Sequence, residues 1–187
     1  ADVKHTNSDG HTSLMVASKE GWTEMVELLV SFRANVNEAD SKGTTSLYMA
    51  CEKGCLAAAK VLIKFGAELE ASMYGYTPFM IACANDRTEV IAFLVEQGAN
   101  VNAVANSGLT ALMLAAQQGY DNGVQYLCDH EVTLNTQDSD GNTALLLACR
   151  NGHLPVVKVL ARAGANLRIA NKKGCLPEQV AYSQVKE

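Results

Sequence analysis

Hydrophobic positions along this chain follow one pattern that returns about every 33 residues. Its clearest copy, GNTALLLACRNGHLPVVKVLARAGANLR from Gly141, places a run of small and apolar residues before a second run at helical spacing. The second run contains Val156, Val157, Val159 and Leu160. This pattern predicts a short helix between Thr143 and Gly152, followed by another helix that ends at Gly164. The chain is therefore expected to stack one small unit repeatedly instead of folding around a unique core.

Glycine, threonine and alanine recur in register within the copies. The glycines that open the copies are Gly10, Gly43, Gly75, Gly108, Gly141 and Gly174. The threonines expected to cap the first helices are Thr12, Thr45, Thr77, Thr110 and Thr143. A threonine hydroxyl there accepts a hydrogen bond from an otherwise unpaired backbone N–H. The aligned alanines are Ala17, Ala50, Ala82, Ala115 and Ala148, and their small size lets neighbouring helices approach closely.

The repeated phrase resembles the ankyrin-repeat consensus, which reads roughly D-x-x-G-x-T-P-L-H-x-A-A-x-x-G-H…V-x-L-L-L-x-x-G-A-x-V-N. The resemblance extends over nearly the whole chain, through five consecutive units. It implies an all-α fold, an ankyrin-repeat solenoid of stacked helix-turn-helix units with short β-hairpin fingers and a concave ligand-binding face. It implies no catalysis by the repeats themselves.

The register predicts a single ankyrin-repeat domain over residues 1–187. Its repeats are expected at about 7–39, 40–71, 72–104, 105–137 and 138–170. Residues 1–6 resemble the end of a preceding repeat, and residues 171–187 resemble a partial closing repeat. We therefore expect a monomeric fragment of a larger protein, with more repeats on the N-terminal side. The alternative is a natural short protein with frayed ends.

Several copies depart from the consensus. The histidine after T-P-L is replaced by Met15, Tyr48, Met80, Met113 and Leu146. The Thr–His ladder typical of the family is therefore expected to be absent, so that apolar packing holds the repeats together. Arg33 and Glu131 replace the glycine at two helix ends, and Asp86 replaces a mid-repeat glycine. A non-glycine residue in the left-handed region costs about 1–2 kcal/mol, so these repeats should be weaker or should end their helices differently.

The turn before the third copy is one residue shorter than the others and is expected to differ in shape. The resemblance implies that positions beside the finger glycine and just before the mid-repeat glycine face a partner. These positions include Met73, Tyr74, Tyr76, Leu109, Glu52, Lys53, Asn85, Gln117 and Gln118. Aromatic side chains are enriched at binding hot spots, so Tyr74 and Tyr76 are expected to contact the partner. Alternatively, the two rings cover the shortened finger and stabilise its hairpin.

Three asparagines each lie eight residues after a leucine, a spacing similar to the pattern that an asparaginyl hydroxylase modifies in many ankyrin-repeat proteins. They are Asn37, Asn102 and Asn135, which follow Leu29, Leu94 and Leu127. Asn102 matches that pattern best. Alternatively, these side chains hydrogen-bond the hairpin turn.

Composition narrows the function classes. A net charge of −5 argues against a general nucleic-acid binder, which presents a basic patch. No apolar run approaches the ~20 residues that span a bilayer, so no direct membrane insertion is expected. Three of the six cysteines, Cys51, Cys83 and Cys149, share one repeat position and are interpreted as small core residues. Six unpaired thiols favour a reducing compartment, so the expected location is cytoplasmic, with a nuclear one possible.

No catalytic, metal or cofactor site is predicted. Cys51 and Cys55 could supply two ligands from one helix, but no His/Cys pair supplies the others at zinc-like spacing. The histidines are not expected to converge on a thiol, and phosphate-binding glycine motifs are absent from the sequence. The sequence therefore favours a non-catalytic scaffold that binds a protein or peptide through its concave face and fingers. The alternative is a regulatory or structural segment that packs against another domain of a larger enzyme, kinase or channel chain.

Overall fold

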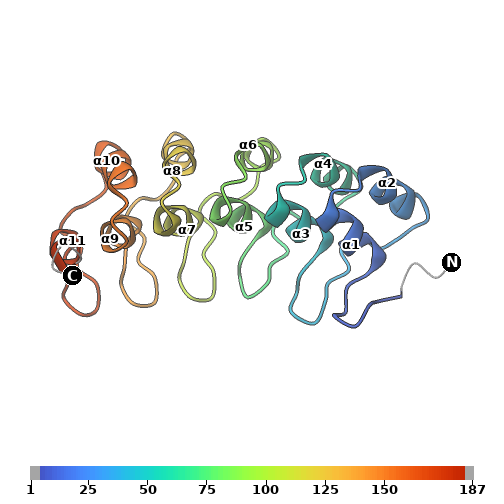
Figure 1. Ribbon diagram of the computed structural model, residues 1–187, viewed down its shortest axis with the longest axis horizontal. Coiled ribbons are helices and arrows are strands. Elements are labelled where there is room, and N and C mark those ends of the chain that lie inside the picture. Colours follow the sequence, from blue (N-terminus) through green and yellow to red (C-terminus); the bar gives the residue numbers. More distant parts are fainter. Residues whose placement is uncertain (1–4, 184–187) are drawn as a thin grey trace. The chain divides into compact units, whose positions relative to one another are not determined.

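The computed structural model describes residues 5–183, with side chains through residue 180. The described residues form eleven helices, shown in Figure 1. They are α1 (Ser13–Glu20), α2 (Thr23–Ser31), α3 (Ser46–Lys53), α4 (Leu56–Lys64), α5 (Pro78–Ala84), α6 (Thr88–Glu96), α7 (Ala111–Gln118), α8 (Asp121–Cys128), α9 (Ala144–Arg150), α10 (Leu154–Arg162) and α11 (Pro177–Ser183). Residues 1–4 and 184–187, parts of the expected partial repeats, lie outside the described residues.

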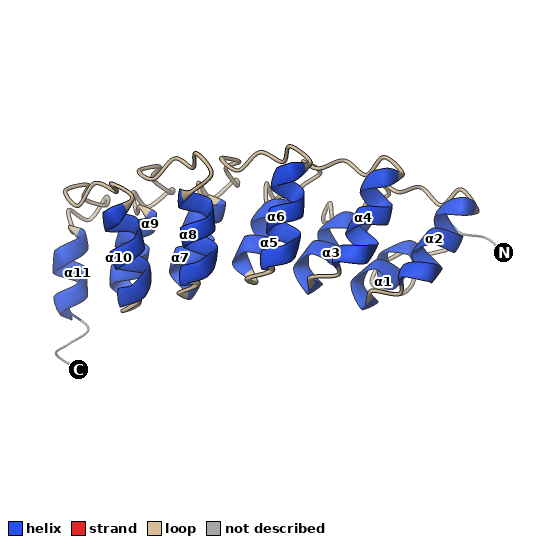
Figure 2. Cartoon of the chain, turned by 90° about the horizontal axis from the view of Figure 1, so that it is seen from above, coloured by secondary structure: helices blue, strands red, loops and turns tan. Residues whose placement is uncertain are grey.

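The helices form two compact units, residues 1–100 and 101–187. In unit 1, α3 packs between α1 and α5, while α4 packs between α2 and α6. In unit 2, α9 packs between α7 and α11, and α10 packs against both α8 and α9. Loops join short antiparallel helices throughout the described part of each unit (Figure 2). This arrangement confirms the expected fold of stacked helix pairs.

The first helix of each full repeat begins at a threonine cap, as the sequence predicts. The Oγ1 atoms of Thr12, Thr45, Thr77, Thr110 and Thr143 accept from the backbone N–H three residues later, at 3.2–3.3 Å. In the first repeat, the backbone N–H of Thr12 also donates to Sδ of Met15 at 3.4 Å. Met15 replaces the consensus histidine, so its thioether makes the reciprocal bond of a capping box.

Small side chains line the interior of the first helices. Ala17, Ala50, Ala82, Ala115 and Ala148 are all buried. The second helices of repeats two to five bury a leucine at one register position, namely Leu62, Leu94, Leu127 and Leu160, whereas α2 buries Val30, one position later in the repeat. Cys51, Cys83 and Cys149 are buried beside them. This burial confirms the interpretation of these three cysteines as small core residues.

Arg33, Asp86 and Glu131 adopt the same backbone conformation as the glycines that they replace. Their φ angles are 62°, 53° and 52°. After Arg33, the N–H of Ala34 donates to the carbonyl of Leu29, just as Ala67 donates to Leu62 after Gly66. Helix α2 therefore ends as α4 does, and the φ angles place all three replacements under the strain of the left-handed region.

The fingers are short hairpins with isolated β-bridges. In the second finger, Ala39 pairs with Thr45 around a turn in which Gly43 donates to Asp40 at 3.0 Å. In the third finger, Met73 pairs with Tyr76, only three residues away. Its two central residues, Tyr74 and Gly75, have φ angles of 52° and 82°, as a two-residue type I′ turn requires. The missing residue therefore gives this finger the different shape that its spacing predicts.

Candidate functional site

Tyr74 occupies the tip of the third finger. Its side chain is exposed, with 61% of the residue accessible to solvent. Asparagine, aspartate and glycine are the residues that favour this turn position, because they tolerate a positive φ. The exposed ring recovers little of the strain through packing. Tyr74 is thus a large aromatic side chain that the backbone holds outward at a local cost in stability.

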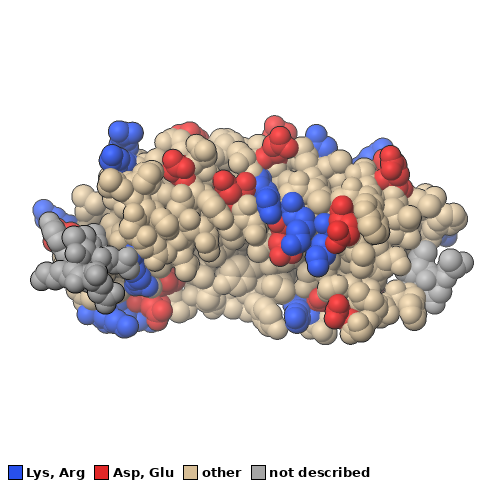
Figure 3. All heavy atoms as spheres, in the orientation of Figure 1, with Lys and Arg blue, Asp and Glu red and all other residues tan. Residues whose placement is uncertain are grey.

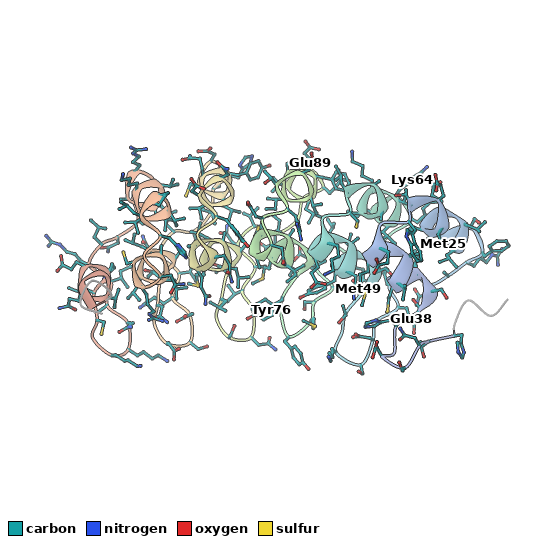
Figure 4. The ribbon with its side chains drawn as sticks, in the orientation of Figure 1. Met25, Glu38, Met49, Lys64, Tyr76 and Glu89 are labelled. Carbon is teal, nitrogen blue, oxygen red and sulfur yellow. The ribbon has the colours of Figure 1, made fainter. Side chains whose placement is uncertain are left out.

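Met73 and Tyr76 lie at the base of the same finger and are half-buried. The hydroxyl of Thr44 donates to Sδ of Met73 at 3.4 Å, which ties the finger to the preceding one. The pKa of Tyr48 is raised to about 12, mainly by burial and to a smaller extent by the nearby Glu52 and Tyr76. Figure 4 shows Tyr76 on the finger side of the α5–α6 pair, whereas Glu89 lies on the α6 side.

Charged residues gather over α3 and α5 of unit 1 (Figure 3). Lys53 lines a polar pocket of about 380 Å³ together with Asp86, Arg87 and Glu89. The Nε of Arg87 donates to the backbone carbonyl of Glu52 at 3.0 Å. Glu52 and Lys53 are therefore placed beside a charged cleft at the helix ends.

Asn85 has a local structural contact. Its side-chain amide donates to the carbonyl of Ile81 at 2.8 Å, at the end of α5. This bond satisfies one of the carbonyls that a helix leaves unpaired at its C-terminus.

In unit 2, Leu109 and Gln117 line a pocket of about 280 Å³ between the fingers and the first helices. Gln118 is exposed at the end of α7. The nine candidate residues therefore fall into one group of six in unit 1 and one group of three in unit 2. Within its own unit, each group is built from finger residues and first-helix ends.

The sequence interpretation missed Arg150, which lines the same pocket as Leu109. Arg150 occupies the repeat position of Glu52 and Gln117, so the register itself could have identified it. The neighbouring Asn151 and His153 both contact the carbonyl of Gln117, through Nδ2 at 2.7 Å and Nε2 at 3.0 Å. These contacts bring the end of α9 against the end of α7.

Asn37, Asn102 and Asn135 hydrogen-bond the backbone of the following repeat. Asn37 accepts from the N–H of Glu68 at 2.9 Å, Asn102 from that of Thr133 at 2.8 Å, and Asn135 from that of Asn166 at 2.8 Å. In the second repeat, Glu70 takes this position and accepts from Asn100 at 2.8 Å. These bonds form an inter-repeat ladder within each unit. Hydroxylation of the asparagines remains a prediction, and mass spectrometry of protein from its native cell would reveal the added oxygen.

An apolar pocket of about 570 Å³ lies on the first repeat, lined by Val16, Trp22, Met25 and Leu29 among others. The residues at the same register one repeat later are Met49, Cys55, Ala58 and Leu62, which lie on α3 and α4 or, for Cys55, at the N-cap of α4, and α1 and α2 pack against these helices. Trp22 is 56% exposed, whereas its counterparts Cys55, Arg87 and His153 bond a carbonyl of the preceding repeat. This pocket therefore has the chemistry of a repeat-stacking surface, not of a polar ligand site.

The described residues contain no group of three or more His, Cys, Asp or Glu arranged to hold a metal ion. All six cysteines are free, and burial raises the pKa of the Cys51 and Cys83 thiols. A raised pKa keeps a thiol protonated and therefore poorly nucleophilic. None of the helices in residues 5–183 has the length and apolar character to cross a membrane.

Comparisons with known proteins agree with this geometry. The family model for ankyrin repeats in three copies matches residues 1–73 and 67–138, and the single ankyrin-repeat model matches residues 140–172. The comparison with curated protein sequences found no significant match. Among solved structures, the chain is similar to the ankyrin repeat domain of Bcl-3, described as a unique member of the IκB protein family. Sequence identity is 31% and the TM-score is 0.85, over 96% of this chain and 82% of that one. The chain belongs to the ankyrin-repeat family.

Proposed function

We propose that this chain is a non-catalytic scaffold that binds a protein or peptide through its fingers and the ends of its first helices. Ankyrin repeats are in general protein-interaction modules. The observation that carries the proposal is the exposed, strained Tyr74 at the tip of the third finger. Strained positions in a folded protein often coincide with functional sites, and aromatic residues dominate binding hot spots.

The second proposal within this class is binding in cis, in which the same surface packs against another domain of a larger chain. The physical demands on the surface are identical, because an interdomain contact resembles a transient protein interface. Capture of a specific partner by this chain alone favours binding in trans. The acidic net charge of −5 supports a protein partner over nucleic acid in both cases. We place the protein in the cytoplasm or nucleus, where its free thiols stay reduced.

The proposal is tested by replacing Tyr74 with asparagine. Asparagine suits the type I′ turn, so the finger keeps its shape while the aromatic ring is removed. The Tyr74→Asn chain should capture its partner from native-cell lysate at least about 30-fold more weakly, the loss expected for a hot-spot residue. Its melting temperature should be equal to or above that of the unmodified chain.

Phe32→Ser provides the matched control, because Phe32 is an aromatic residue of similar exposure, 65%, at the end of α2 instead of on a finger. This control should retain partner capture. If Tyr74→Asn binds normally, or if Phe32→Ser loses binding to the same extent, the fingers are not the interaction surface.

A further inference from the structure

Arg150 lies half-buried in the unit 2 pocket, held by one well-placed hydrogen bond. Its Nη2 donates to Oδ1 of Asn142 at 2.6 Å. Asn142 is 2% exposed, and its Oδ1 also accepts from Nδ2 of Asn171 at 3.2 Å. The finger holds the buried amide of Asn142 in place, and the hydrogen bond from Arg150 to this amide holds the guanidinium in place. Arg150 is therefore preorganised before any partner arrives.

The guanidinium has unused hydrogen-bonding capacity. An arginine carries five N–H donors, and one of those of Arg150 is bonded within the described residues. No described carboxylate oxygen lies within 4.0 Å of its nitrogens. The guanidinium is therefore free of a carboxylate partner within the described residues, and a ligand carboxylate can pair with it.

Two aspartates also line this pocket, and only one of them has an engaged carboxylate. Asp138 accepts from the backbone N–H groups of Asp140 and Asn142 and from Nδ2 of Asn142, at 2.8–3.2 Å. The carboxylate of Asp138 is therefore occupied by hydrogen-bond donors of its own finger. Asp140 is exposed at the finger tip, where solvent and salt screen its effect on a ligand.

Apolar surface completes the pocket. Leu109 is half-buried on the fourth finger, and Leu147 is buried on α9, one turn before Arg150. A glutamate side chain matches this combination, because its methylenes fit against leucine while its carboxylate pairs with a guanidinium in bidentate geometry.

We propose that this pocket binds an acidic side chain of the partner, with Arg150 pairing the carboxylate and Leu109 contacting its aliphatic part. This inference rests on the proposed binding function and specifies the chemistry of one contact: the partner presents a glutamate side chain to this pocket. Arg150 supplies specificity at this point through its planar, bidentate donors, which lysine lacks.

The test uses the whole chain and two blocked pentapeptides, acetyl-Ala-Leu-Glu-Leu-Ala-amide and the same peptide with glutamine in place of glutamate. An NMR titration follows the Nε–H signal of Arg150. The glutamate peptide should shift this signal and bind about fivefold more tightly than the glutamine peptide, the upper range for a partly exposed ion pair. Arg150→Gln should abolish the preference, and Arg150→Lys should retain part of it. Arg162→Gln, an exposed arginine on α10, is the control and should leave the preference unchanged.

The Asp140→Asn variant tests whether the pocket favours an anionic ligand. Because solvent and salt screen this exposed rim carboxylate, removing it should leave binding of the glutamate peptide unchanged or slightly tighter, whereas weaker binding would overturn the proposal. Equal binding of the two peptides, no shift of the Arg150 signal, or a preference that survives Arg150→Gln would also overturn it. If partner capture still depends on Tyr74 in that case, the scaffold function stands and only the acidic contact fails.

Discussion

The side chain of Asn102 bonds the backbone on both sides of Val132: its Nδ2 donates to the carbonyl of Glu131 at 3.3 Å, and its Oδ1 accepts from the N–H of Thr133 at 2.8 Å. Glu131 is one of the residues held at positive φ. One amide therefore secures the strained helix end of the next repeat. Repeat arrays are stabilised mainly by contacts between nearest neighbours, so the inter-repeat ladder contributes directly to their cohesion.

Asn102→Ala should destabilise unit 2 by about 0.5–1.5 kcal/mol, the net contribution of an ordinary hydrogen bond, because water can reach the exposed backbone groups that lose their partner. Urea denaturation followed by circular dichroism measures the loss. Asn106→Ala, at an exposed finger position of the following repeat in the same unit, should change stability by less than about 0.5 kcal/mol. Equal effects of the two substitutions would show that the ladder bond contributes nothing measurable.

Glu131→Gly should stabilise the protein by about 0.5–1 kcal/mol. Glycine removes the strain at φ 52°, although it also increases the entropy of the unfolded chain. Gly164→Ala is the reverse change at the matching helix end, where φ is 93° and an added Cβ meets no atom within 4 Å, and it should lower stability by a similar amount. Thermal denaturation of both variants checks this prediction. A lower melting temperature for Glu131→Gly would mean that the glutamate side chain offsets its own strain.

The repeat register predicted the helix pairs and the threonine caps, because each depends on local sequence repeated at a fixed spacing. It left open whether Arg33 and Glu131 take the glycine-like conformation, which both residues adopt. It did not predict that Tyr74 itself takes a positive φ, which follows from closing a hairpin with one residue fewer. The register could have identified Arg150, which shares the repeat position of Glu52 and Gln117, but not its pocket, because the pocket depends on side chains from two neighbouring fingers. Whether the nine candidate residues form one binding surface stays a prediction.

Gly141→Ala should destabilise the protein by about 1–3 kcal/mol more than Gly10→Ala. Both glycines open a repeat at nearly the same φ, 79° and 80°, so both variants carry the same backbone strain. A Cβ on Gly141 would lie 2.8 Å from the backbone N of Lys172, whereas one on Gly10 meets nothing within 4 Å. Overpacking of this kind forces the backbone to shift and threatens the bond from Lys172 N–H to the Asp140 carbonyl. Comparable losses of stability in the two variants would show that the fifth finger accommodates the added Cβ without further destabilisation.

The second finger should weaken in acid through Asp40. Burial raises the pKa of Asp40, but hydrogen bonds from Thr44 and Lys42 and the nearby His11 outweigh burial and hold the pKa below its ordinary value of 3.8. A lowered pKa in the folded state stabilises the fold above about pH 4, and this contribution disappears as the pH falls through the folded pKa. Asp40→Asn should therefore flatten the loss of stability between about pH 5 and pH 3. Identical acid profiles for the two proteins, measured by urea denaturation, would contradict this assignment.

Site-specific photo-crosslinking tests the interaction surface most directly. A benzophenone amino acid is placed at position 74 on the finger tip or, as control, at position 32 on α2, and each chain is irradiated in native-cell lysate. Binding through the fingers should give one specific protein adduct from position 74 and none from position 32, identified by mass spectrometry. A specific adduct from position 32 with none from position 74 would contradict the account.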